Sequence, residues 1–203
     1  MSRPHLSLRW FALVAAGLAL AACTGAGPDP ADPATAASTT PASVAVIDRA
    51  RAAVTALAAD DATTLAGLAD PARGVTFSPY AFIADDAVTV PAGGLAAMMA
   101  DPAPRAWGTW DGSGFPIELT WPDYRDQVLF GGRDYAHAPT VTVDDPQTGG
   151  NAPDNSAAYF GGGTTVVEFS FPATDLGGTD WSALRLVFSE AGLVGVIRDV
   201  WTI

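Results

Sequence analysis

The last 40 residues constrain the fold of this chain most strongly. Three segments, "TTVVEFSF", "WSALRLVFS" and "LVGVIRDVWTI", are rich in β-branched and aromatic residues, and glycine-bearing turns join them. Segments of this kind in close succession are typical of an antiparallel meander. We therefore expect these three strands to form most of a β-sheet.

Both faces of this predicted meander are partly apolar. Side chains two residues apart share one face of a strand. One face of each strand carries the sets Val167, Phe169 and Phe171; Leu184, Leu186 and Phe188; and Leu193, Ile197, Asp199 and Trp201. The opposite faces carry Val166 and Glu168; Arg185 and Val187; and Val194, Val196 and Arg198. This pattern suits a sheet with helices on one side and a partly lined, concave pocket on the other.

Helices precede the strands. Residues 44–69 place apolar side chains at helical spacing, with a break at Asp60-Asp61 and an end before Pro71. Shorter helices are predicted over 93–100 and 120–130, with Thr120 as an N-cap, and shorter strands over 86–90 and 140–145. Residues 101–119 read as loop or short strand, and residues 144–163 as a long polar loop. Helices first and paired strands last indicate an α+β fold.

The N-terminal segment predicts export. Two arginines precede about a dozen apolar residues, the length of a signal-peptide core and too short to span a bilayer. The tetrad Leu20-Ala21-Ala22-Cys23 resembles a bacterial lipobox, which implies cleavage before Cys23 and a diacylglycerol thioether on its sulfur. Two acyl chains would hold the protein firmly at a membrane. The alternative is ordinary secretory cleavage after "ALA" at 19–21, with Cys23 incidental.

The predicted organisation is a lipoprotein signal peptide (1–22), a lipid-anchored disordered linker (23–43) and one α+β domain (44–203). The linker consists of small residues, proline, threonine and serine with two aspartates, and it cannot bury enough surface to fold. With Cys23 lipidated, no cysteine remains for a disulfide, so packing must hold the domain.

Charge and composition exclude several functions. The chain after residue 22 has eight arginines, no lysine and 22 acids, a formal charge of −14. Such a balance argues against nucleic acid or anionic lipid as a partner. No Cys/His cluster, "GxSxG", "HExxH" or glycine-rich phosphate loop is present, so we expect no metal and no cofactor.

Four stretches carry a resemblance. "GVTFSPYAFI", "WDGSGFPIELTWPDY", "DWSALRLVF" and "LVGVIRDVWTI" resemble a family of uncharacterised bacterial secreted proteins and lipoproteins, over most of residues 73–203. No activity follows from that resemblance. The order of helices and strands is also similar to the NTF2-like α+β cone.

Aromatic residues beside carboxylates form the first candidate site. They are Trp107, Trp110, Asp111, Trp121 and Tyr124. Such groups hold sugars, choline-like cations or peptides by stacking and cation–π contact. The alternative is that these tryptophans close the core over a glycine-rich loop.

Two residues are candidate general bases. His137 lies three residues after Asp134, although a hydrogen-bonded structural role is the alternative. Asp199 shares a strand face with Ile197 and Trp201, so it needs a raised pKa or a partner, and the position would suit a base in an NTF2-like cone. Its alternatives are an ion pair with an arginine at the sheet edge or a change of face at a bulge.

One acidic loop offers oxygen ligands for calcium at Asp144, Asp145, Asn151, Asp154 and Asn155. Its spacing departs from the EF-hand pattern, and a solvated turn is the alternative. Taken together, the sequence predicts a lipid-anchored, extracytoplasmic envelope protein. We expect a non-enzymatic module that binds an envelope protein or small ligand; the alternatives are an NTF2-like enzyme using His137 or Asp199, or a module that only stabilises an envelope assembly.

Overall fold

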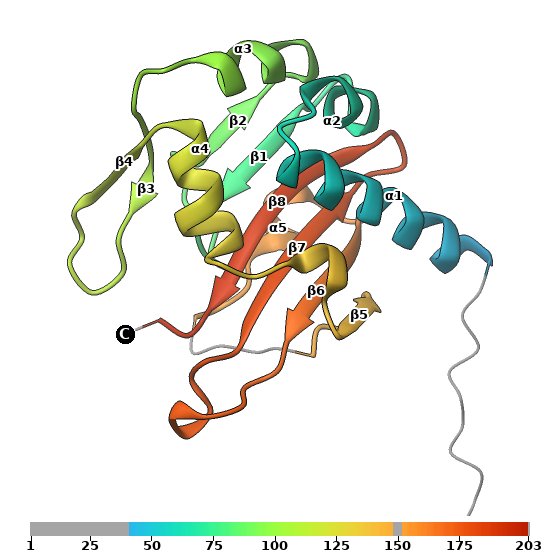
Figure 1. Cartoon of the computed structure of the whole chain (residues 1–203). Coiled ribbons are helices and arrows are strands. Elements are labelled where there is room, and N and C mark those ends of the chain that lie inside the picture. Colours follow the sequence, from blue (N-terminus) through green and yellow to red (C-terminus); the bar gives the residue numbers. More distant parts are fainter. Residues whose placement is uncertain (1–40, 148–151, 203) are drawn as a thin grey trace, which may run out of the picture. The chain divides into compact units, whose positions relative to one another are not determined.

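Figure 1 shows the computed structural model, which describes residues 41–147 and 152–202. The predicted signal peptide, Cys23 and all but the end of the predicted linker lie outside these residues. The helices are α1 (Pro41–Ala58), α2 (Ala62–Leu68), η1 (Ala92–Gly94), α3 (Leu95–Ala100), α4 (Trp121–Asp123), η2 (Tyr124–Phe130), η3 (Tyr135–His137), α5 (Ser156–Phe160) and η4 (Leu176–Gly178). The strands are β1 (Val75–Ser78), β2 (Val88–Val90), β3 (Arg105–Thr109), β4 (Pro116–Leu119), β5 (Thr140–Val143), β6 (Thr165–Phe171), β7 (Ser182–Phe188) and β8 (Leu193–Val200).

The strands form one six-stranded sheet and a separate hairpin. The sheet has the order β2-β1-β8-β7-β6-β5, in which only β1 and β8 are parallel. The β6–β7–β8 meander confirms the prediction for the last 40 residues, and the helices and sheet together confirm the α+β class. Strands β3 and β4 form the hairpin within the stretch predicted as loop or short strand.

The N-terminal helices follow their sequence signals closely. Helix α1 begins at Pro41, three residues before the predicted start, and proline suits a first turn because its missing N–H needs no partner there. The predicted break is confirmed: Asp60 has a φ of 54°, and the Asp61 side chain caps α2 by accepting the Thr64 N–H. Thr120 caps α4 as predicted, and the helix continues as the π-helix η2. No helix in the described part of the chain has the length and apolarity needed to cross a bilayer.

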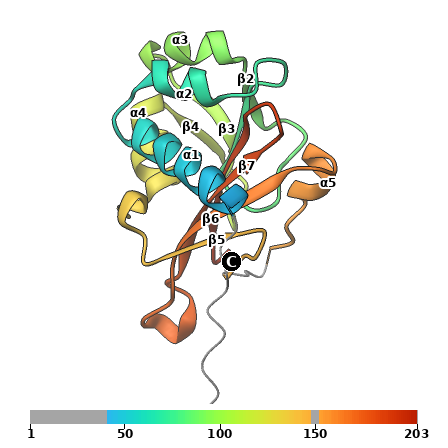
Figure 2. The same ribbon diagram turned by 90° about the vertical axis from the view of Figure 1, so that its right-hand side faces the viewer.

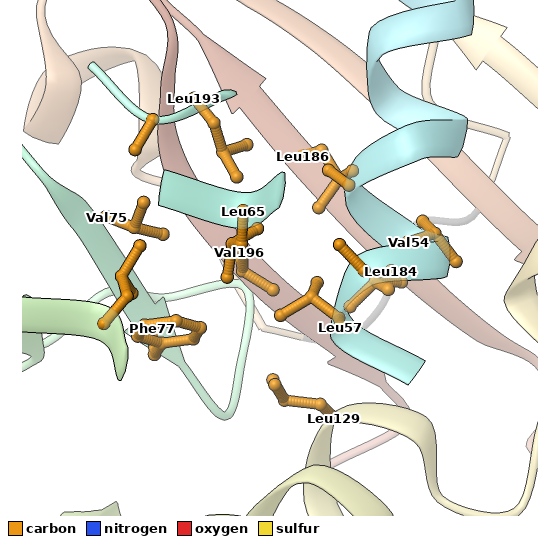
Figure 3. Close-up of a cluster of buried hydrophobic side chains, with 14 of the residues drawn as sticks. Val54, Leu57, Leu65, Val75, Phe77, Leu129, Leu184, Leu186, Leu193 and Val196 are labelled. Atoms are coloured by element: carbon orange, nitrogen blue, oxygen red, sulfur yellow. The ribbon is translucent and has the colours of Figure 1, made fainter. Parts of the chain in front are cut away.

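The main core lies between these helices and one face of the sheet. Figure 3 shows Leu57 of α1 and Leu65 of α2 against the strands β1, β7 and β8. The η2 residue Leu129 closes the same cluster. Burying an aliphatic side chain contributes about 1.5–3 kcal/mol, so this cluster is the main source of fold stability.

The opposite face of the sheet is also covered. Figure 2 shows α5 on the side of the sheet away from α1. Phe160 of α5 packs on β8 at Gly195, where a Cβ atom would lie 2.6 Å from the phenyl ring. A smaller cluster forms there from Ile83, Phe160, Val187, Val194 and Ile197. The prediction of uninterrupted loop over 144–163 is therefore wrong, because this five-residue helix is too short to show a periodic signal.

A bulge in β8 changes both predicted faces of that strand. The pairing with β7 shifts between Val187 and Phe188, so that Phe188 lies opposite Leu193. An extra residue in one strand reverses the alternation of faces beyond it. Leu193 consequently joins the helix-side core while Ile197 joins the opposite cluster. The predicted shared face of Leu193 with Ile197 and Asp199 is therefore wrong for Leu193. The predicted shared face of Val194 with Val196 and Arg198 is wrong for Val194.

Candidate functional site

A pocket of about 220 Å³ lies between the 78–87 segment and strand β3. We call it the aromatic pocket. Its walls come from residues between Ser78 and Ala87, residues between Trp107 and Asp111, and from Ala152 and Thr202. The pocket thus joins segments that lie far apart in the sequence. Aromatic rings and two carboxylates, Asp86 and Asp111, dominate its chemistry.

Two hydrogen bonds made by side-chain hydroxyls and one glycine shape the aromatic pocket and join its walls. The Ser78 hydroxyl donates to the Tyr80 carbonyl at 2.7 Å, which fixes the turn after β1. The Tyr80 hydroxyl accepts the backbone N–H of Asp111 at 3.0 Å, which ties that turn to the β3–β4 hairpin. Gly108 has a φ of 129°, and a Cβ atom there would lie 3.3 Å from Pro79. Glycine therefore permits this close approach of β3 to the turn.

Asn155 holds the pocket segment by hydrogen bonds. It lies on the face of the sheet that α5 covers, which we call the outer face. Its side-chain carbonyl accepts the Ile83 N–H at 2.8 Å, and its side-chain amide donates to the Ile83 carbonyl at 2.9 Å. Ile83 is itself buried in the outer-face cluster. One side chain thus supplies both hydrogen bonds that a neighbouring strand would give, in the middle of the segment that carries Tyr80, Phe82 and Asp86.

Replacing Asn155 with alanine is expected to loosen this segment without unfolding the domain. The Ile83 N–H and carbonyl would lose their partners, at a cost of about 1–3 kcal/mol. Hydrogen exchange at the Ile83 amide should become faster than at amides of β7. Asn155→Asp keeps the acceptor and should retain most of that protection. Unchanged exchange at Ile83 in Asn155→Ala would contradict the role assigned to Asn155.

A buried charge cluster lies on the same outer face. Arg185 forms ion pairs with Glu168 at 2.9 Å, Asp154 at 2.9 Å and Asp199 at 2.7 Å. Glu168 and Asp199 are each 1 % exposed. One guanidinium therefore faces three carboxylates, two of which water hardly reaches.

Asp199 is the carboxyl of this cluster whose pKa is raised. Burial raises the pKa of Asp199 to about 6, helped by Glu168 and Asp154 and opposed by Arg185. Its Oδ1 atom has no hydrogen-bond partner among the described residues. Protonation of this carboxyl at mildly acidic pH reduces the net negative charge of the cluster from −2 to −1. The structure shows the predicted alternative of an ion pair with an arginine, but it joins the central strands β7 and β8 rather than lying at the sheet edge.

The buried charge cluster anchors the connection between β5 and α5. Glu168 accepts the backbone N–H of Gln147 at 2.9 Å, and Asp154 accepts the N–H of Ser156 at 2.7 Å. The Asp144 side chain accepts the N–H of Val166. Of the side chains offered as calcium ligands, Asp144, Asp154 and Asn155 therefore make hydrogen bonds or ion pairs within the protein. Among the described residues the structure gives no such contact for the side chain of Asp145, and Asn151 lies outside them. No group of three or more His, Cys, Asp or Glu residues in 41–147 and 152–202 is placed to hold a metal ion.

The five predicted aromatic-site residues divide between core and surface. Trp107, Trp121 and Tyr124 are buried, and the rings of Trp107 and Tyr124 stack with centroids 4.0 Å apart. Trp107 also reaches the wall of the aromatic pocket. Trp110 and Asp111 lie exposed on the β3–β4 hairpin, and Asp111 lines the pocket. The alternative core role thus describes Trp107, Trp121 and Tyr124, which all belong to the main core. Trp107 and Asp111 also line the aromatic pocket.

The two candidate bases lie away from the aromatic pocket. The His137 ring is 84 % exposed and pairs with Asp134 at 2.8 Å, an interaction that lowers the pKa of Asp134. Asp199 lies inside the buried charge cluster on the outer face. Neither residue lines the pocket, and the structure does not bring the two together.

The sequence did not predict the pocket wall formed by residues 79–87, nor the hydrogen bonds from Asn155 that hold it. Asp86 falls within the strand predicted over 86–90, and no motif marks Tyr80 or Phe82 as site residues in the sequence. Nothing in the sequence links Asn155 to Ile83, 72 positions away.

The chain matches no protein-family model, and comparison with curated proteins and with solved structures finds no significant match to either. The resemblances to a family of secreted proteins and to the NTF2-like cone therefore stay predictions.

Proposed function

We propose that this chain is a lipid-anchored envelope protein whose α+β domain binds a small ligand, or a group presented by a partner, in the aromatic pocket. The observation that carries this proposal is the pocket itself. Its walls combine Tyr80, Phe82 and Trp107 with two carboxylates, and hydrogen bonds from three directions hold them in place. A preformed hollow lined by aromatic and a few polar groups is the usual form of a ligand site.

Binding fits the arrangement better than catalysis does. The carboxyl with the raised pKa is committed to Arg185 on the outer face, and the histidine is exposed on a short turn. A general base must lie within hydrogen-bond reach of the bound substrate. Neither group meets that requirement in the aromatic pocket.

A ligand screen with a blocked pocket tests the binding function. Cell-wall fragments and small envelope metabolites would be screened by ligand-observed NMR against the full-length chain in a maltoside detergent. Compounds that bind should lose binding in Ala84→Trp, which fills the pocket from an exposed wall position. They should keep it in Ala103→Trp, a matched change at an exposed alanine outside the lining. An affinity that stays the same in both variants, or the absence of any binding compound, would count against the proposal.

The anchor has its own test. Cys23→Ser should move the protein from the membrane fraction to the soluble fraction, because each buried methylene contributes about 0.8 kcal/mol and two acyl chains hold where one is marginal. Intact mass of the wild type should show the added diacylglycerol. Thr24→Ala should leave both results unchanged. An unmodified Cys23, with the wild type already in the soluble fraction, would support ordinary secretory cleavage instead. A Cys23→Ser protein that stays at the membrane would contradict the lipid on Cys23 as the anchor.

A further inference from the structure

We propose that the ligand of the aromatic pocket is a small organic cation, such as a trimethylammonium group. This inference rests on the proposed binding function and adds the chemical class. Three features of the pocket point to it: the sign of its charge, the kind of rings that it exposes, and its size.

The charge of the pocket is negative. Its described lining contains Asp86 and Asp111 and neither arginine nor histidine. Asp85 adds a third acid next to the wall, and the chain after residue 22 has a formal charge of −14. A concave surface of one sign concentrates ions of the opposite sign. Phosphates, carboxylates and other anions are therefore disfavoured, and cations are favoured.

The exposed rings suit a weakly hydrated cation. Phe82 is 52 % exposed and Tyr80 is half-buried, and both residues line the pocket. Trp107 is already stacked on Tyr124, and its indole N–H donates to the Leu119 carbonyl. It therefore contributes an apolar wall rather than a donor. Ring faces beside carboxylates are how proteins recognise quaternary ammonium groups.

The size of the pocket limits the ligand. A volume of about 220 Å³ is smaller than the range of about 300–1,000 Å³ that is typical of sites for drug-sized ligands. The pocket accommodates one headgroup rather than several sugar rings. Among the ligands that aromatic and acidic residues recognise, a compact cation fits best.

Choline and its neutral isostere 3,3-dimethylbutan-1-ol give the direct test. Isothermal titration calorimetry on the full-length chain in a maltoside detergent should show choline binding at least about tenfold more tightly, because only choline gains the cation–π and charge interactions. Its affinity should fall as salt rises. Asp86→Asn should weaken choline about two- to fivefold, whereas Asp85→Asn, outside the lining, should change it less. Phe82→Leu should weaken it about two- to fivefold, and Phe82→Tyr should preserve it.

The outcomes separate this inference from the proposed function. Equal binding of choline and its neutral isostere would contradict the inference that the ligand is a cation, while the pocket would remain a binding site. Binding of a screened compound in a manner sensitive to Ala84→Trp, with no binding of choline, would do the same. Failure of every compound would overturn both. Binding of Cys23→Ser protein to phosphatidylcholine vesicles but not to free choline would assign the ammonium group to a lipid rather than to a solute.

Discussion

Replacing Arg185 with methionine is expected to lower the free energy of unfolding by about 3–5 kcal/mol. The substitution leaves Glu168 and Asp199, each 1 % exposed, without the cation that all three carboxylates of the cluster share. Removing one partner of a buried ion pair is costly because the other charge stays desolvated. The melting temperature should fall by about 10 °C for a domain of this size.

Two further variants show whether charge, rather than packing, causes the loss. Arg185→Lys keeps the charge but cannot contact three carboxylates at once, so it should lie between wild type and Arg185→Met. The triple change Glu168→Gln, Arg185→Met and Asp199→Asn removes the buried charges of this cluster and should recover much of the lost stability. A loss below about 1 kcal/mol in Arg185→Met, by urea denaturation at pH 7.5, would contradict the assigned role.

The stability of the wild type is expected to fall as pH rises through about 6, because of Asp199. The folded state raises the pKa of this carboxyl from its ordinary value of 3.8 to about 6, mainly by burial. The folded protein therefore holds a proton that the unfolded chain has released, and stability decreases with pH. The full contribution is about 3 kcal/mol below pH 3.8, and about 1–2 kcal/mol of it is lost between pH 5 and 8.

Asp199→Asn isolates this contribution. An amide cannot titrate, so the free energy of unfolding of the variant should depend less on pH between pH 5 and 8. In the difference between wild type and variant, the contributions of all other titrating groups cancel. Asp85→Asn removes an exposed carboxylate and should leave the profile as in wild type. Denaturation curves at half-unit pH steps give the comparison. Parallel profiles for wild type and Asp199→Asn would show that Asp199 is ionised throughout this range.

Local sequence signals predicted much of the fold. The three C-terminal strands, the α1–α2 break at Asp60-Asp61 and the Thr120 cap all depend on residues within a few positions of one another. Such features follow from side-chain periodicity and capping chemistry, which one segment carries by itself. The face of Asp199 was predicted for the same reason.

Features that depend on distant contacts were not predictable in this way. The bulge at Val194 has no composition signal, and α5 is stable because Phe160 packs on Gly195 of another element. The parallel pairing of β1 with β8 brings together segments more than 110 residues apart. The aromatic pocket depends on that pairing and on Asn155, so the sequence yielded Trp107 and Asp111 but not the opposite wall.

The most direct test of the account is to locate a bound ligand on the folded chain. Amide chemical shifts would be recorded for the full-length protein while the tightest-binding compound of the screen is added. The account predicts that the largest changes fall on the amides of Tyr80, Gly108 and Asp111, with little change at the exposed His137. Changes centred on another face of the domain, with the pocket amides unmoved, would contradict the claim that the aromatic pocket is the functional site.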